Sequence, residues 1–269
     1  MTSGSAGIVV DESLAPIIED QLAVFESSYP DAHFKLSYKP ENQLLNYFLN
    51  DSVRIAIMSR KLKANEARVF ERMNIKIRTN RFAVDAIALI VNNSARDTAI
   101  TVDEIISIMR GEDQAKSLVF DNANSSTVRY LKELAGVSTL PSKGVYALKT
   151  NLEVIEHVHN NIGAIGVIGV NWVKQPSKAL EPLINKLRIL GVKNLSGKPG
   201  DDRFYHPTQD NLALGLYPLS RDLYIINCTG GPGLGTGFAT FIAGERGQRI
   251  VLKSGLLPDS IPPREILLK

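Results

Sequence analysis

The hydrophobic positions along the chain form short apolar runs that alternate with amphipathic segments. Residues 8–10 are an apolar run, and after a polar turn the apolar residues recur at helical spacing over 14–25. We expect Ser13 to cap this helix, which must end before Pro30. The first predicted unit is therefore a buried strand followed by an amphipathic helix.

This order of strand and helix repeats along the chain. Because such repeats favour parallel strands covered by helices, we predict an α/β fold with mostly parallel sheets. Further strands are predicted at 34–38, 53–58, 82–91, 118–120, 164–170 and 223–226, and helices at 44–49, 65–73, 101–110, 127–134, around 154–158, and on both sides of Gly244 within 237–255. A capping box, Thr101 with Glu104, opens one of these helices, and residues 191–211 are expected to be irregular.

Composition narrows the class of protein. The chain has 269 residues, 44% of them hydrophobic, and a net charge of +3, with basic residues scattered among 28 acidic ones. This excludes a disordered chain and gives no basic stripe for nucleic acid. The single cysteine, Cys228, excludes an internal disulfide and is expected to be a packed thiol at a strand end.

Three predicted turns share one design, in which a strand ends, polar residues follow and a helix begins. They are Asp11–Ser13, Pro40–Asn42 and Asp121–Thr127. In a parallel sheet these turns meet at the carboxyl edge of the strands, where ligands of open α/β sheets bind. Free helix amides and the hydroxyls of the third turn would suit a tetrahedral oxyanion. The alternative is that all three turns are ordinary helix caps.

Two charged residues extend this site. Arg60 directly follows a predicted strand, and Asp85 interrupts an otherwise apolar one. A buried carboxylate needs a partner, so we predict that Arg60 pairs with Asp85 and faces the ligand. Alternatively, Arg60 is a solvated surface residue.

Other motifs carry no chemistry. His157 and His159 point apart on a helix, so no metal site is predicted. Gly230–Gly237 lacks the pattern of a nucleotide loop, and no nucleophile lies in an elbow motif. We therefore expect neither an enzyme nor a bound cofactor.

Several stretches, in this order and with these gaps, resemble the substrate-binding proteins of phosphate ABC transporters. The resemblance covers nearly the whole chain and is carried by residues 55–60, 83–92, 164–169, 217–224 and 247–255. It implies a type II periplasmic-binding-protein fold, in which two α/β lobes are joined by two hinge crossings. The crossings would lie near 82–85 and 217–221, so that one lobe holds 1–82 plus 219–269 and the other 83–218.

The resemblance also implies a ligand site. Ser125-Ser126-Thr127 matches the phosphate loop of the family, while Asp121 stands where the family has an arginine, and the first two turns are acidic where the family is rich in glycine and serine. The predicted ligand-binding residues are Glu12, Ser13, Glu41, Asn42, Ser59, Arg60, Asp85, Asn124, Ser125, Ser126 and Thr127.

The sequence thus predicts a monomeric receptor that captures phosphate or a similar oxyanion for a membrane ABC transporter permease. It would act in the periplasm or at the outer face of the membrane, after removal of a signal segment and with or without a lipid anchor. The alternative is a sensor or interaction module of the same fold that binds another solute or a protein partner. Ligand identity and affinity are left open.

Overall fold

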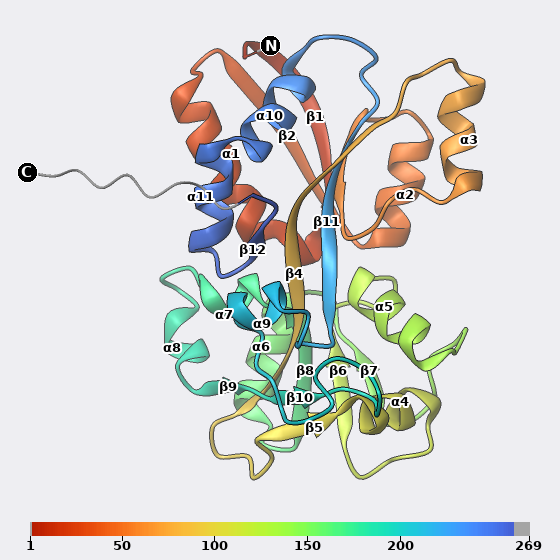
Figure 1. The fold of residues 1–269 in the computed structure, drawn as a ribbon, viewed down its shortest axis with the longest axis vertical. Helices are drawn as coiled ribbons and strands as arrows, with labels where there is room; N and C mark the ends of the chain where they lie inside the picture. The colour runs from red at the N-terminus through yellow and green to blue at the C-terminus, as the bar shows by residue number, and fades with distance from the viewer. Residues whose placement is uncertain (1, 261–269) are drawn as a thin grey trace, which may run out of the picture.

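The computed structural model describes residues 2–260, which form two α/β lobes stacked end to end (Figure 1). Strands β1 to β3 and helices α1 to α3, α10 and α11 build the upper lobe, and α4 to α9 surround the lower one. Two long strands, β4 and β11, run through the middle. The strands are β1 (Gly4–Asp11), β2 (Ala32–Lys39), β3 (Ile55–Met58), β4 (Arg78–Asn92), β5 (Ala99–Thr101), β6 (Ser117–Phe120), β7 (Val145–Ala147), β8 (Ala164–Gly169), β9 (Leu187–Ile189), β10 (Gly191–Lys193), β11 (Ser220–Asn227) and β12 (Leu257–Pro258).

The helices follow the strands in the predicted alternation. Each predicted helix is present, with ends that differ by a few residues. They are the 3₁₀ helix η1 (Glu12–Leu14) and α1 (Ala15–Ser28), α2 (Glu41–Leu49), α3 (Ala64–Arg72), α4 (Val102–Arg110), α5 (Ser126–Ala135), α6 (Asn151–Asn160), α7 (Asn171–Lys174), α8 (Glu181–Ile184), α9 (Gln209–Ala213), α10 (Leu234–Ala243) and α11 (Glu245–Lys253).

One strand joins the sheets of the two lobes. The strand order is β2-β1-β3-β11-β4-β8-β6-β7, so β4 belongs to both sheets. Its first half pairs with β11 as far as Ala86, and its second half pairs with β8 from Ile87 onward. The α/β fold is confirmed. The division into lobes at 82/83 and 218/219 stays a prediction, and both positions lie close to this switch of partners.

The strands within the lobes pair in parallel, and the two crossing strands add antiparallel pairs to this pattern. The pairs β1–β2, β1–β3, β6–β7 and β6–β8 are parallel, as strands linked by helices usually are. The crossing strands β4 and β11 run antiparallel to each other and to their outer neighbours, β8 and β3. The reason is that one of the two carries the chain out of the upper lobe and the other carries it back.

The first turn also differs from its prediction. Ser13 does not cap α1. Asp11 accepts a hydrogen bond from the Ser13 amide at 3.0 Å and thereby caps η1, and α1 begins only at Ala15. A 3₁₀ turn between strand and helix points the Ser13 side chain inward, where it is fully buried.

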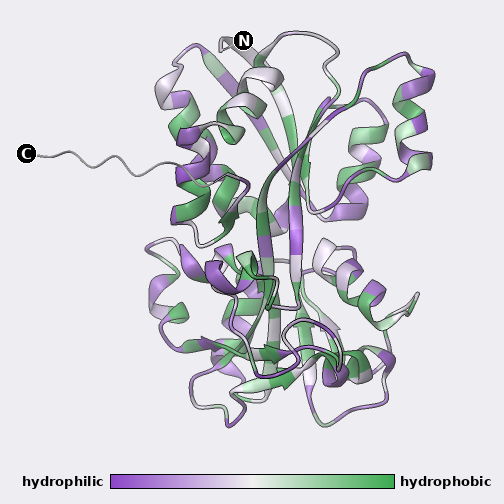
Figure 2. Cartoon of the chain, in the orientation of Figure 1, coloured by the Kyte–Doolittle hydropathy of each residue, from purple (hydrophilic) through white to green (hydrophobic). Residues whose placement is uncertain are grey.

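Apolar side chains fill the space between the sheets and the helices. Figure 2 shows hydrophobic residues along the strands, with hydrophilic stretches on β4 and β11, and a mixture of both kinds on the helices. The largest cluster runs without a break from Phe25 and Ile57 in the upper lobe through Ile87 in β4 to Val119 in the lower lobe. The two lobes therefore share one continuous core.

Local predictions agree with the structure at most turns. The Thr101–Glu104 capping box is present, and Gly111 and Gly136 end their helices in the left-handed conformation that glycine adopts at low cost. The segment predicted to be irregular, 191–211, nevertheless contains β10 and the start of α9. Cys228 is buried as predicted, and burial raises the pKa of its thiol to about 12.

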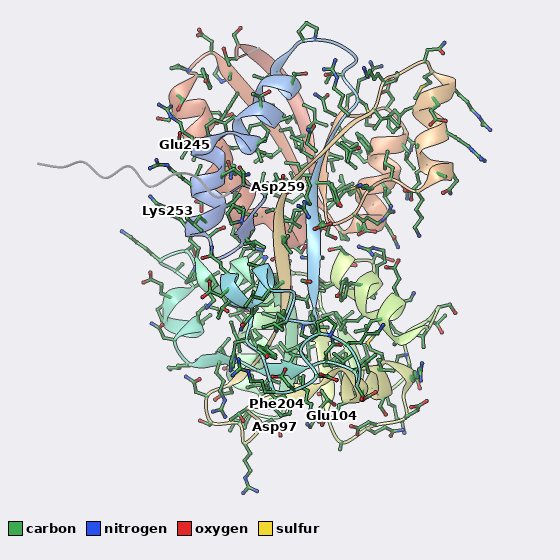
Figure 3. The ribbon with its side chains drawn as sticks, in the orientation of Figure 1. Asp97, Glu104, Phe204, Glu245, Lys253 and Asp259 are labelled. Carbon is green, nitrogen blue, oxygen red and sulfur yellow. The ribbon has the colours of Figure 1, made fainter. Side chains whose placement is uncertain are left out.

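The segment after α11 is fixed to the crossing strand. Arg81 in β4 donates to Asp259 at 2.6 Å and forms a second ion pair with Asp222 at 3.2 Å (Asp259 is labelled in Figure 3). Because these side chains are partly exposed, the contacts add little stability and mainly set the position of the segment.

Candidate functional site

An arginine on a crossing strand is the centre of the candidate site. Arg221 in β11 lies directly opposite Asp85 in β4. Its Nε donates to Asp85 Oδ2 at 2.9 Å, and its Nη2 lies 2.8 Å from the same oxygen in an ion pair. Both side chains are almost fully buried. A cation is thus held at the point where the two lobes join.

This arrangement corrects the predicted pair of Arg60 with Asp85. Arg60 instead donates to Glu66 at 2.8 Å and to Glu41 at 2.9 Å. The strand order explains the error, since β11 lies between β3, which precedes Arg60, and β4, which carries Asp85. Arg221 is therefore the neighbour that can neutralise Asp85.

Hydroxyl groups from both lobes converge on the same guanidinium. Arg221 donates through Nη1 to Ser126 Oγ at 2.8 Å and through Nη2 to Ser13 Oγ at 3.0 Å. The two serine oxygens lie 3.2 Å apart, and both residues are fully buried. Ser13 belongs to the first predicted turn and Ser126 to the third, so the structure brings these two turns together.

The rest of the third turn forms its own network. Ser125 Oγ and Thr127 Oγ1 lie 2.8 Å apart, and Thr127 donates to Asp121 Oδ1 at 2.9 Å. Asn151, the first residue of α6, donates to Asp121 Oδ2 at 3.2 Å. Asp121 therefore lies beside the loop, at the position where the resemblance implies an arginine, and accepts from a hydroxyl group of the loop. A cation at this position would repel the hydroxyl hydrogens.

The second turn lies at the mouth of the site. Glu41, only 1% exposed, accepts from Arg60 and also from Arg129 Nε at 2.7 Å, and so links the upper lobe to α5 of the lower lobe. Arg129 also donates to Ser59 at 3.3 Å. These contacts bring Glu41, Ser59 and Arg60 together in a second network, beside the one that Arg221 forms with Asp85.

Two exposed asparagines close the same side. The Asn42 amide donates to the Asn124 carbonyl at 3.3 Å, and their side chains meet at 3.2 Å. A groove of about 240 Å³ opens here, lined among others by Ser125 and Arg129. The groove runs beside the third turn and the start of α5, and Arg221, Ser13 and Ser126 are not part of its lining.

The opposite side is closed by α7. Asn171 and Trp172 both donate to the Ser13 carbonyl, at 3.3 and 3.1 Å. Gly169 comes so close that a Cβ there would lie 3.0 Å from that carbonyl oxygen and 2.8 Å from Asn171 Nδ2. The glycine thus permits the close approach of β8 to the first turn.

Burial and the acidic groups shape the electrostatics. Burial raises the pKa of Asp11 against the opposing effect of Arg221, and burial likewise raises the pKa of Asp121. Burial together with Asp121 and Asp11 raises the pKa of the half-buried Glu12 to about 7. Burial lowers the pKa of Arg221, but Asp85 and Asp11 outweigh it, so the net shift is upward and the cation is retained.

Sequence reasoning missed the central cation and several of its neighbours. Arg221 and Asp11 were not among the predicted site residues, nor were Asn151, Asn171 and Trp172. A signal for Arg221 was present, because the residue lies in segment 217–221, which the resemblance marks as a crossing between the lobes. What the sequence does not give is which two strands lie side by side.

Within the described residues there is no cluster of metal-binding side chains. Among residues 2–260, no helix has the length and apolarity needed to cross a bilayer. At its centre the site presents the Arg221 guanidinium, four hydroxyl groups and a set of carboxyl groups. Such a set can hold an anion through the cation and the hydroxyls.

Two α/β lobes with a buried polar site between them are the architecture of type II periplasmic binding proteins. The family model described as PBP superfamily domain matches residues 2–246. The chain belongs to this family.

Individual relatives are more distant. The chain is similar to the phosphate-binding protein PstS of Pseudomonas aeruginosa, with 24% identity over 95% of this chain and 83% of the relative. PstS of Borreliella burgdorferi is also 24% identical, over 91% of this chain and 86% of the relative.

Solved structures show the same fold. A structure from Clostridium perfringens, described as a phosphate ABC transporter substrate-binding protein with bound phosphate, aligns with a TM-score of 0.77 at 20% identity, covering 96% of this chain and all of that chain (100%). An ABC-type phosphate transport receptor from Vibrio cholerae aligns with a TM-score of 0.70 at 18% identity, covering 95% and 100%.

The buried ion pair makes a prediction for stability. Arg221→Met should destabilise the protein by about 3–5 kcal/mol, because it leaves Asp85 buried without its cation. The double variant Arg221→Met with Asp85→Leu should recover part of this loss, since the carboxylate paired with the cation is then removed while Asp11 stays buried nearby. Urea unfolding monitored by circular dichroism measures both.

Arg81→Met is the matched control, because Arg81 lies on the same pair of strands in an exposed ion pair. It should change the free energy of unfolding by less than about 1 kcal/mol. A double variant as unstable as the single one would contradict this account of the pair.

Glu12 makes a prediction for pH dependence. Its pKa is higher in the folded protein, about 7, than the ordinary 4.5. The raised pKa therefore adds to the free energy of unfolding most fully below about pH 4.5, where the carboxyl is protonated in both states. This contribution is lost as the pH rises through about 7 and the folded protein must hold the ionised carboxylate. Glu12→Gln should raise stability by about 1–2 kcal/mol at pH 8, after allowance for partial exposure, and leave it unchanged at low pH.

Thermal melts across this pH range test the effect. Glu156→Gln, at an exposed position of α6, is the control and should leave the pH profile as it is. Parallel stability profiles for Glu12→Gln and the wild-type protein would show that the surroundings of Glu12 do not raise its pKa.

Proposed function

We propose that the protein captures phosphate or a similar tetrahedral oxyanion between its lobes and delivers it to a membrane ABC transporter permease. The observation that carries this proposal is the convergence of Ser13, Ser126 and Arg221. Each of the two lobes supplies a hydroxyl, and the crossing strand supplies a buried cation. A ligand bound here would contact both lobes at once, as a receptor that closes around its solute requires.

The relatives support the same class of ligand. Two are named phosphate-binding proteins, and the Clostridium perfringens structure is described as carrying phosphate. The predicted phosphate loop, Ser125-Ser126-Thr127, lies at the start of α5, whose amides and positive dipole end favour an anion. Hydroxyls, amides and one guanidinium together can replace the water that surrounds a free oxyanion.

Opening of the lobes is part of this function. In the closed state Ser13 and Ser126 are in direct contact, so an anion can enter between them only when the lobes separate. The lobes would hinge where β4 and β11 cross, with 1–82 plus 219–269 moving against 83–218. Glu41–Arg129 and Asn42–Asn124 are the contacts that such a motion would break first, because they lie at the mouth.

The protein would act as a monomeric binding protein and without catalysis. The site has hydroxyls beside carboxylates, but the hydroxyls of Ser13 and Thr127 donate to Asp11 and Asp121 in a network that holds their positions. Its place of action would be the periplasm or the outer face of the membrane, where a transporter receives its solute.

Titration calorimetry with phosphate, sulfate and molybdate tests the proposal. At least one of the three should bind, and Ser126→Ala should weaken its binding about tenfold or more, because a buried donor to the anion is lost. Ser142→Ala is the control, since Ser142 is exposed in the connection between α5 and β7.

Trp172 offers a second measurement, because the chain has a single tryptophan and its indole donates to the Ser13 carbonyl. Binding that closes the lobes should change its fluorescence. An absence of heat with all three anions over a wide range of concentration would rule out the oxyanion and favour a sensor or interaction module that binds another solute or a partner.

A further inference from the structure

The hydrogens of the site's hydroxyl groups are directed to carboxylates, either directly or through a second hydroxyl group. Ser13 Oγ donates to Asp11 Oδ1 at 2.8 Å, and Thr127 Oγ1 donates to Asp121 Oδ1 at 2.9 Å. Because Thr127 has used its hydrogen, Ser125 is the donor in the 2.8 Å contact between them. Ser126 accepts from Arg221, and the nearest hydroxyl oxygen to which it can donate is that of Ser13, at 3.2 Å.

An oxyanion needs the opposite arrangement. A fully ionised oxyanion such as sulfate only accepts hydrogen bonds, so it must be offered hydrogens that are now directed at Asp11 and Asp121. If these carboxyl groups take up protons, they no longer need the serine and threonine hydrogens, which can turn to the ligand. The protonated acids also become donors themselves.

The charges of the site lead to the same conclusion. Asp11, Asp85 and Asp121 are each 1% exposed or less, and Arg221 is the buried cation among them. Asp85 is the one in direct ion-pair contact with Arg221, through Oδ2, and this contact opposes the burial that raises the pKa of Asp85 as well. A sulfate or phosphate ion added to this set without protons would bring its charge close to two further carboxylates.

Asp11 and Asp121 are the groups that can take up protons. Asp11 faces Arg221 of β11, Glu41 of α2 and Asp85 of β4, and it also lies near Glu12 and Asp121. Its Oδ2 atom is buried and has no hydrogen-bond partner among the described residues. A proton on that oxygen would give it a hydrogen bond to donate.

Asp121 has a partner suited to its protonated form. It faces Asp11, Glu12 and Arg221, and its Oδ2 now accepts from the Asn151 amide. The fully buried Asn151 leaves its own Oδ1 without a partner within residues 2–260. When the amide rotates, this oxygen can accept from a proton on Asp121.

Building on the proposed function, we propose that oxyanion binding at Arg221 is coupled to the uptake of protons by Asp11 and Asp121. These two carboxyl groups are then specificity-determining residues, since they admit a fully ionised oxyanion only together with protons. Burial, which raises the pKa of both groups, acts in the same direction. Binding should accordingly strengthen as the pH falls.

Sulfate is the probe that tests this, because it carries no proton of its own between about pH 5.5 and 8. Its dissociation constant should rise about tenfold per pH unit for each proton taken up. Titration calorimetry in two buffers of different ionisation enthalpy counts these protons directly, which a purely structural role would not affect. Asp11→Asn and Asp121→Asn should each reduce the slope and the number of protons by about one.

These variants keep the size of the side chain and an acceptor for Ser13 or Thr127, and thermal melts verify their folding. Asp103→Asn, at an exposed position of α4, is the control and should keep the full slope. An unchanged slope in both site variants would place the protons elsewhere and overturn the inference.

Sulfate binding that is independent of pH, without heat that depends on the buffer, would overturn the inference and leave the proposed function intact. Binding of phosphate alone, with no heat from sulfate at any pH, would also overturn it, because the protons would then reside on the ligand. Failure of every anion to bind at any pH would instead reject the proposed function, and the inference with it.

Discussion

The buried ion pair of Arg221 with Asp85 is the interaction on which the rest of the structure depends. It joins the two strands that run between the lobes, and it occurs where β4 exchanges its partner β11 for β8. A carboxylate in this apolar strand is stable only beside its cation. Arg221 also donates to Ser13 and Ser126, so the pair that joins the two crossing strands also assembles the site.

The fold could be predicted from the sequence because its signals are local. Strand and helix periods, the capping box of Thr101 and the glycine at 111 each specify structure within a few residues, and their alternation specifies an α/β fold. The directions of β4 and β11 were the exception. A strand that returns between lobes has the same apolar pattern as one in a parallel sheet, so its direction depends on the whole chain path.

The site was predictable only in part for the same reason. Ser13 and Ser126 follow strands, and general rules bring such turns to one edge. Arg60 also follows a strand, yet β11 separates it from Asp85, and no local pattern reveals that neighbour. Glu41 illustrates a second difficulty, since an acidic residue at a helix start resembles a simple cap but here joins two arginines from different lobes.

A crystal structure of the protein grown with phosphate tests the central claim most directly. The account predicts an anion bound between the lobes, in contact with Arg221 and the hydroxyl of Ser126, with the ion pair between Arg221 and Asp85 intact. An anion held instead by Arg60 and Arg129, with the contacts of Arg221 to Ser13 and Ser126 unchanged, would contradict it.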